Sequence, residues 1–151
     1  MVKKKVRRKE QRTEIDKGWN WRFENVVIVS SVESKVRRLT VRIIQKWQQE
    51  GYDTIAVVCR NAMEAELVAK NLGKRIAIEE SDLEKAEFKK GIMVLPVEYT
   101  KGLEFDTVLI YNPTSNNYPE DDGHAKLLYV AATRALHELT VLHVGDVTRL
   151  L

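Results

Sequence analysis

The chain has 151 residues, of which 44% are hydrophobic and 31% charged, with a formal net charge of +3. This length suits one domain with a buried core, and the composition is that of a soluble globular protein. No apolar run approaches the roughly 20 residues of a membrane span, and the single cysteine, Cys59, excludes an internal disulfide framework. The basic N-terminus is not followed by an apolar stretch, so it is not a secretory signal, and we expect a cytoplasmic protein without membrane contact.

The positive charge is concentrated at the N-terminus. Residues 1–22 contain 9 Lys or Arg and 3 Asp or Glu, whereas the remainder contains 16 basic and 19 acidic residues. A basic block of this kind repels itself and offers few apolar side chains on which to fold. We therefore interpret residues 1–22 as a solvated, partly disordered tail, with contact to nucleic-acid phosphates as the alternative. Residues 23–151 are assigned to one folded domain.

Apolar runs alternate with segments of helical period along this domain. Strands are predicted at 26–29, 55–59, 75–78, 92–95, 107–111 and 139–144. The first helix follows a capping box of Ser30 and Glu33 and ends at Gly51. The second ends at Gly73, and a third is predicted over 126–135. The charged segment 79–90 and the Asn- and Pro-rich segment 112–123 separate the later elements.

The predicted strands are continuous apolar runs rather than alternating ones, and helices lie between them. This pattern is typical of a mostly parallel sheet covered by helices on both faces, a three-layer α/β domain. Such a fold often carries a phosphate-binding loop of the form G-x-x-x-x-G-K-[ST]. Of the seven glycines only Gly73 precedes a lysine, yet Val68 stands five positions before it and Arg75 follows that lysine. The phosphate loop is therefore missing, and we expect the chain alone not to hydrolyse ATP.

Two segments in the last third carry chemistry. The first, 96–105, follows a predicted strand and runs into the next one, and ligands of open α/β sheets collect at the carboxyl ends of strands. Gly102 within it permits a tight turn or a close approach of the backbone to a ligand. The second, 127–135, is an apolar segment with one strong cation, Arg134, whose guanidinium suits bidentate contacts to phosphate oxygens.

These segments resemble motifs V and VI of the UvrD/Rep-type superfamily 1 helicases. The match lies in Val97 and 101–105 for motif V, and in 129–130 with 133–135 for motif VI. Residues 55–61 also resemble the segment that opens the second RecA-like half of that family. The resemblance implies a RecA-like, P-loop NTPase-like fold for residues 23–151, as the C-terminal motor domain of an ATP-dependent DNA helicase or translocase. Its partners would be an N-terminal P-loop motor domain of the same protein and single-stranded DNA.

The resemblance also implies roles for individual residues. Arg134 matches the catalytic arginine finger that stabilises charge on the γ-phosphate. Glu104 matches the glutamate at the sugar end of the nucleotide, while Lys101 and Gly102 match the element that couples the nucleotide to the nucleic acid. ATP and Mg²⁺ would be the cofactors, both completed by the N-terminal half.

Three further positions match the nucleic-acid contacts of the family, namely Thr100, Arg60 and Asn61. Arg60 and Asn61 could instead only cap the following helix. Glu98 stands where many family members have a histidine near the single strand, which places an anion beside the expected phosphate track.

Two features leave open which kind of protein contains this domain. The span 78–92 has no room for the large insertion that these helicases carry. The sequence of 101–106, 126–129 and 133–139 is most similar to the HelD-like branch. Members of that branch are helicase-like ATPases that act on bacterial RNA polymerase, so RNA polymerase is a possible partner. A third alternative is an interaction module without catalytic activity. The three histidines and Cys59 fit no metal-binding spacing, so we expect no metal site built from them.

Overall fold

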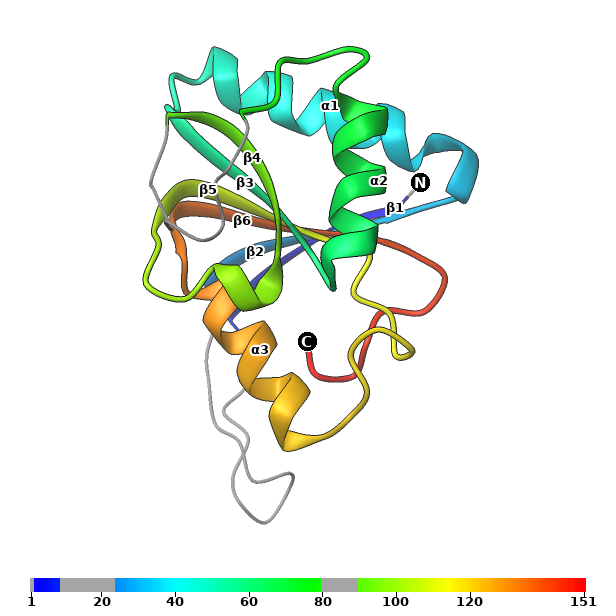
Figure 1. Ribbon diagram of the computed structural model, residues 1–151. Helices are drawn as coiled ribbons and strands as arrows, with labels where there is room; N and C mark the ends of the chain where they lie inside the picture. Colours follow the sequence, from blue (N-terminus) through cyan, green and yellow to red (C-terminus); the bar gives the residue numbers. More distant parts are fainter. Residues whose placement is uncertain (1, 9–23, 80–89) are drawn as a thin grey trace.

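The computed structural model describes residues 2–8, 24–79 and 90–151 (Figure 1). Its strands are β1 (Val2–Arg8), β2 (Glu24–Ser31), β3 (Thr54–Cys59), β4 (Gly91–Pro96), β5 (Phe105–Tyr111) and β6 (Ala135–Val144). Its helices are α1 (Glu33–Gln49), α2 (Ala62–Leu72) and α3 (Asp122–Ala132), with a short 3-10 helix, η1 (Val97–Tyr99). None of the described helices is long and apolar enough to cross a membrane. Most of the predicted charged segment, 80–89, lies outside the described residues.

The strands form one sheet in the order β1-β2-β6-β5-β3-β4, and β2, β6, β5, β3 and β4 run parallel to one another. Helices α1 and α2 cover one face, whereas α3 and η1 cover the other (Figure 1). Successive residues of β3 point to opposite faces, so Val57 packs under α1 and α2 while Val58 packs toward α3. Both faces are covered, which is why the strands are apolar throughout. The predicted mostly parallel, three-layer α/β fold is confirmed.

Part of the predicted disordered tail is a strand. Residues 2–8 form β1, which pairs antiparallel with β2 from Val2 opposite Ser30 to Arg8 opposite Glu24. The edge of β2 explains this difference, because it offers backbone N–H and C=O groups with which another strand can pair. Such pairing uses only backbone groups, so the edge strand can consist largely of charged residues. Residues 9–23, including Trp19 and Trp21, lie outside the described residues, so their part of the prediction remains untested.

Two local predictions were wrong. Ser30 belongs to β2, where it pairs with His143, so α1 begins without the expected capping box and its N-cap is Val32. The predicted strand at 75–78 is not formed, because β4 takes the place next to β3 at that end of the sheet. Ile76 and Ile78 nevertheless pack, partly buried, against the core beneath α1 and α2. The apolar pattern of 75–78 therefore indicated burial and not strand pairing.

Candidate functional site

The predicted site residues fall on two opposite edges of the sheet. In a parallel sheet the amino ends of the strands share one edge and the carboxyl ends share the other. Gly102 and Glu104 immediately precede β5, and Arg134 immediately precedes β6, so these three residues lie at the amino edge. Arg60 and Asn61 follow β3 and lie at the carboxyl edge. The sequence had placed the motif V segment at carboxyl ends of strands, and this was correct only for its first residues.

The segment between β4 and β5 crosses the α3 face of the sheet from one edge to the other. Its midpoint is fixed by Thr100, which is fully buried and donates its hydroxyl hydrogen to the carbonyl of Val97 at 2.7 Å. The N–H of Leu103 donates to the Thr100 carbonyl at 3.1 Å, and the Leu103 side chain is buried in the core. Between these anchors Gly102 has a φ of +82°, a left-handed conformation that glycine adopts without strain. The turn therefore leaves Gly102 and Glu104 exposed.

The sequence predicted that Arg134 lies in a helix, but the structure has it in the turn between α3 and β6. Helix α3 ends at Ala132, where Thr133 donates its hydroxyl hydrogen to the Tyr129 carbonyl at 2.9 Å. The half-buried Arg134 folds back along the helix, and its Nε donates to the carbonyl of Val130 at 3.0 Å. Its own carbonyl accepts the N–H of Phe105 at 2.9 Å. This bond ties the Arg134 turn directly to the residue that follows Glu104.

These two turns open onto one cleft of about 750 Å³ at the amino edge. The residues that line it are Asp53, Thr54, Lys90, Gly102, Leu103, Glu104, Asp106, Arg134 and Leu136. The predicted nucleotide residues Gly102, Glu104 and Arg134 are therefore brought together, whereas Lys101 is exposed and is not among the lining residues. No carboxylate of the described residues forms an ion pair with Arg134. The cleft thus offers a guanidinium and a carboxylate to a ligand.

Asp106 holds the floor of this cleft together. Its Oδ2 accepts the backbone N–H groups of Asp53 at 2.8 Å and Thr54 at 3.1 Å, and its own N–H donates to the Thr54 hydroxyl at 2.8 Å. Burial opposes ionisation of this carboxyl, but the hydrogen bonds from Asp53 and Thr54 outweigh it and hold the pKa of Asp106 below its usual value. His137 Nε2 lies 3.9 Å from Oδ1. Asp106 therefore locks the start of β5 onto the start of β3.

The sequence did not single out Asp53, Lys90 or Asp106 as site residues. Each lies at or just before the amino end of a strand, namely β3, β4 and β5. Because the amino ends of parallel strands meet at one edge, grouping the residues before each predicted strand would have found them.

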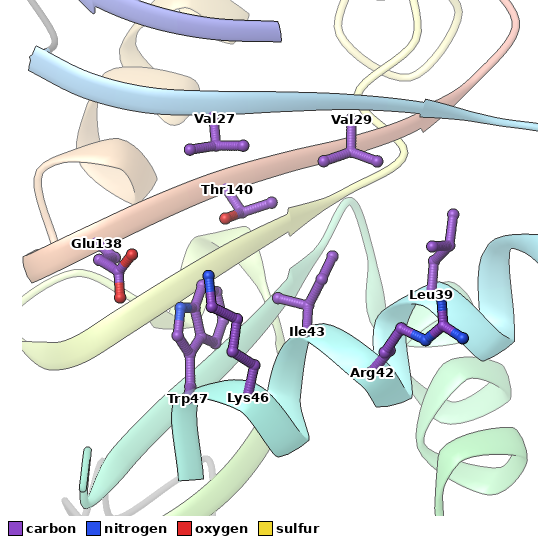
Figure 2. Close-up of a pocket in the computed structure, with 9 residues that line it drawn as sticks. All are labelled: Val27, Val29, Leu39, Arg42, Ile43, Lys46, Trp47, Glu138 and Thr140. Atoms are coloured by element: carbon purple, nitrogen blue, oxygen red, sulfur yellow. The ribbon is translucent and has the colours of Figure 1, made fainter. Parts of the chain in front are cut away.

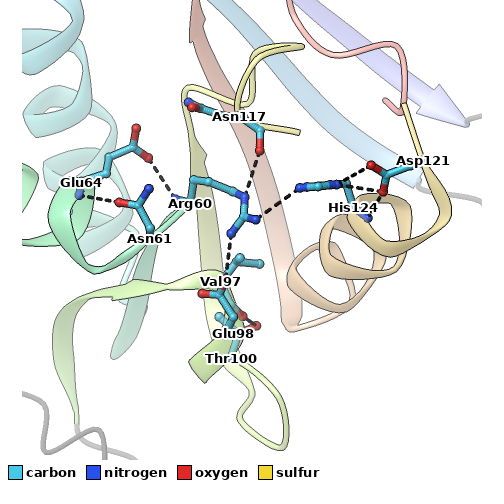
Figure 3. Close-up of polar contacts among 9 residues, drawn as sticks. All are labelled: Arg60, Asn61, Glu64, Val97, Glu98, Thr100, Asn117, Asp121 and His124. Atoms are coloured by element: carbon cyan, nitrogen blue, oxygen red, sulfur yellow. Dashed lines mark hydrogen bonds and ion pairs between the residues drawn. The ribbon is translucent and has the colours of Figure 1, made fainter. Parts of the chain in front are cut away.

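At the carboxyl edge Arg60 is the centre of a polar cluster (Figure 3). Its Nη1 donates to Glu98 Oε1 at 2.7 Å, and its Nε donates to the Asn117 carbonyl at 2.9 Å. Its Nη2 lies 3.2 Å from His124 Nε2. Since a guanidinium can only donate, Nε2 accepts, and the imidazole proton therefore resides on Nδ1, which lies 2.8 Å from the Asp121 carboxylate. Arg60 is thus bound on three sides within the protein.

The other two predicted nucleic-acid contacts also have internal roles. Asn61 is the N-cap of α2, because its Oδ1 accepts the N–H of Glu64 at 2.9 Å. Thr100 is fully buried, as described above. Glu98, which departs from the histidine of the family pattern, is the ion-pair partner of Arg60. The capping alternative for Asn61 therefore describes what its side chain does, and nucleic-acid contact by Arg60, Asn61 and Thr100 remains a prediction.

Comparison with known proteins identifies the fold. Residues 91–142 match the family model of the UvrD-like helicase C-terminal domain. The crystal structure of the C-terminal domain of a possible DNA helicase from Lactobacillus plantarum WCFS1 is similar, with a TM-score of 0.71 and 31% sequence identity. The similarity covers 83% of this chain and 76% of that one. The chain belongs to the UvrD-like helicase C-terminal domain family.

The family match coincides with the cleft of this UvrD-like C-terminal domain. The matched residues run from the start of β4 into β6 and include Gly102, Glu104, Asp106 and Arg134. Arg60 precedes the matched region. No curated protein matches the chain.

Proposed function

We propose that this chain is the C-terminal RecA-like motor domain of an ATP-dependent UvrD-like DNA helicase or translocase, and that its amino-edge cleft forms the far wall of the ATP site. The observation that carries the proposal is the convergence of Gly102, Glu104 and Arg134 on one cleft from two separate turns. These turns are tied to each other by the hydrogen bond from the Phe105 N–H to the Arg134 carbonyl. Residues from separate motifs therefore act on one ligand.

Arg134 suits the role of an arginine finger. Its Nε donates to the Val130 carbonyl at 3.0 Å, and the only other hydrogen bond from its guanidinium to the described residues is a long one, 3.4 Å, from Nη2 to the Thr133 hydroxyl. The terminal nitrogens can therefore donate to phosphate oxygens in the bidentate geometry that a guanidinium favours. A positive charge held at this point stabilises the charge that develops on a transferring γ-phosphate.

Glu104 completes the ligand-binding character of the cleft. Its exposed carboxylate can accept hydrogen bonds from sugar hydroxyls, and the preceding glycine-containing turn lets the backbone come close to the nucleotide. An open cleft of about 750 Å³, lined by the cations Lys90 and Arg134 and by carboxylates that include Glu104, can hold one side of ATP. Mg²⁺ would be held by the phosphates together with the N-terminal half. Bound ATP would supply the phosphoryl group whose transfer drives movement along DNA.

Because the chain has no phosphate loop, the proposal requires a companion N-terminal motor domain that supplies it. The test is Arg134→Ala in the full-length parent, with Lys74→Ala, an exposed residue in the turn after α2, as the matched control. An arginine finger contributes about 10³–10⁵ to kcat, so turnover should fall by at least about 10³-fold in the first variant and stay unchanged in the second. Normal turnover of the Arg134→Ala protein would refute the finger assignment.

The sequence of 101–106, 126–129 and 133–139 supports a second candidate, the same domain of a HelD-like ATPase that remodels RNA polymerase. Both candidates use the same ATP cleft and differ only in what the motor acts upon. Full-length protein that unwinds a tailed duplex supports the helicase, whereas specific capture of RNA polymerase without unwinding supports the HelD-like candidate. A parent protein without an upstream P-loop half would favour the third candidate, a non-catalytic interaction module.

A further inference from the structure

The side chains predicted to contact nucleic acid are bound or buried within the protein, so a surface exposed to nucleic acid has to lie elsewhere on the fold. Arg60 is held by Glu98, Asn117 and His124, and Thr100 is fully buried. Exposed cations gather instead on α1. The α1 basic row consists of Lys35, Arg38, Arg42 and Lys46, all of which are exposed.

The spacing of three, four and four residues places this row on one side of the helix. At about 100° per residue the four side chains fall within an arc of about 80°, and at 1.5 Å per residue they extend over about 16 Å. Among the described residues only Lys46 of the α1 basic row has an ion-pair partner, Glu50 at 3.7 Å, and both side chains of that pair are well exposed. Lys35, Arg38 and Arg42 therefore present their charges to solvent without a neutralising carboxylate among the described residues.

The α1 basic row lies beside a groove at the β2 side of the sheet. Figure 2 shows Arg42 and Lys46 beside a groove between α1 and the strands β2 and β6, with Val27 and Val29 of β2 opposite them. The next strand beyond β2 is β1, whose sequence VKKKVRR contains five basic residues among seven. The α1 basic row thus lies on the part of the fold that is closest in the sheet order to the basic N-terminal strand.

We propose that the α1 basic row is a docking surface for the phosphate backbone of nucleic acid. The exposed side chains of α1 are Glu33 at its start and then serine, glutamine, lysine and arginine, and these later types are the ones that contact phosphates. No large hydrophobic side chain of α1 is exposed. A protein partner would need such apolar or aromatic anchors at the centre of its interface, whereas a sugar-phosphate backbone needs only charge and hydrogen-bond donors.

The choice of DNA as the nucleic acid rests on the proposed function, but the surface itself does not involve the ATP cleft. The experiment is fluorescence anisotropy of labelled oligothymidylate titrated with the whole chain, in the absence of nucleotide, over a range of salt concentrations. Failure here would leave the ATP-site proposal standing, since that proposal is tested by turnover of the parent protein.

The variant is Arg38→Ala with Arg42→Ala, and the matched control is Lys70→Ala with Lys74→Ala, which removes two exposed cations near the end of α2. Counterion release predicts a slope of about −0.7 per single-strand phosphate contact in a plot of log K against log salt. The first variant should therefore flatten the slope by about 1.4 and weaken binding roughly 25-fold at about 0.1 M salt. Residual binding is expected from the remaining basic residues.

The control should retain the affinity and the salt slope of the unmodified chain. Equal loss in both double variants would mean that net charge alone governs binding, and this would overturn the proposal. Unchanged affinity and slope in the α1 variant would overturn it as well. Displacement of the DNA by polyglutamate at lower charge concentration than by unlabelled DNA would assign the surface to an acidic protein partner instead.

Discussion

Asp106 supports the amino edge on which the cleft is built, and its removal has a calculable cost. Asp106→Ala deletes the acceptor of two backbone N–H bonds, from Asp53 at 2.8 Å and from Thr54 at 3.1 Å. Hydrogen bonds to a charged group contribute about 1.5–3 kcal/mol each, but the Asp106 side chain is 25% exposed and water can replace part of this. We expect the free energy of unfolding to fall by about 2–4 kcal/mol, and the melting temperature by at least about 4 °C.

Asp106→Asn separates geometry from charge. Both N–H bonds go to Oδ2, so an amide oxygen in that place can accept them, and the loss should be only about 1 kcal/mol. The folded-state pKa of Asp106 lies below its usual value, so its charge stabilises the fold above roughly pH 4 and this contribution is lost as the pH falls through the folded-state pKa. The Asn variant and the unmodified chain should therefore converge toward acid.

The assay is urea unfolding followed by far-UV circular dichroism at neutral and at acid pH. Glu66→Ala, an exposed carboxylate on α2, is the control and should stay within about 0.5 kcal/mol of the unmodified chain. If Asp106→Ala behaved like Glu66→Ala, the β3–β5 bridge would not carry the stability assigned to it.

Three further predictions concern single side chains, and each is measured by urea or thermal unfolding. Gly102→Ala should lower the free energy of unfolding by about 1–2 kcal/mol, because Gly102 has a φ of +82°. Gly123→Ala inside α3 should raise it by about 0.5–1 kcal/mol. Effects of the same sign would contradict this pair of predictions. Glu138→Gln should raise the free energy of unfolding by up to about 1 kcal/mol, since Oε2 is buried with no hydrogen-bond partner among the described residues and burial raises the pKa of this carboxyl. That gain should grow as the pH rises above about 4.3, and an equal gain in acid would count against it. Arg60→Ala should cost roughly 2–4 kcal/mol through its three lost contacts, and an unchanged melting temperature would show that the carboxyl-edge cluster is not structural.

The central strands could be predicted because burial on both faces leaves an unambiguous apolar run. Cys59 and the residues before it in β3 are fully or almost fully buried, and Trp47 of α1 is 2% exposed, as its helical face predicted. The edges could not be predicted in this way. Whether 2–8 or 75–78 forms a strand depends on which segment reaches an open sheet edge, and local pattern does not record that competition.

Gly102, Glu104 and Arg134 of the candidate site could be predicted from the sequence, but their arrangement and the other lining residues could not. Arg134 and Glu104 were recognisable from their motifs, yet their meeting at the amino edge depends on a segment that crosses the sheet between β4 and β5. The Arg60 cluster joins residues 38 to 64 positions apart, and such distant pairing leaves no periodic signal. Glu98 is an example. It departs from the family pattern, and only the structure shows its partner, Arg60, whose Nη1 lies 2.7 Å from Glu98 Oε1.

In the proposed function this chain supplies one wall of an ATP site and cannot complete the reaction by itself. The most direct measurement is phosphate release from ATP by the isolated chain in the presence of Mg²⁺ and single-stranded DNA, beside its Arg134→Ala variant. We expect both proteins to release phosphate no faster than buffer, because neither contains a phosphate loop. Hydrolysis by the isolated chain that disappears in the Arg134→Ala variant would contradict the proposed function.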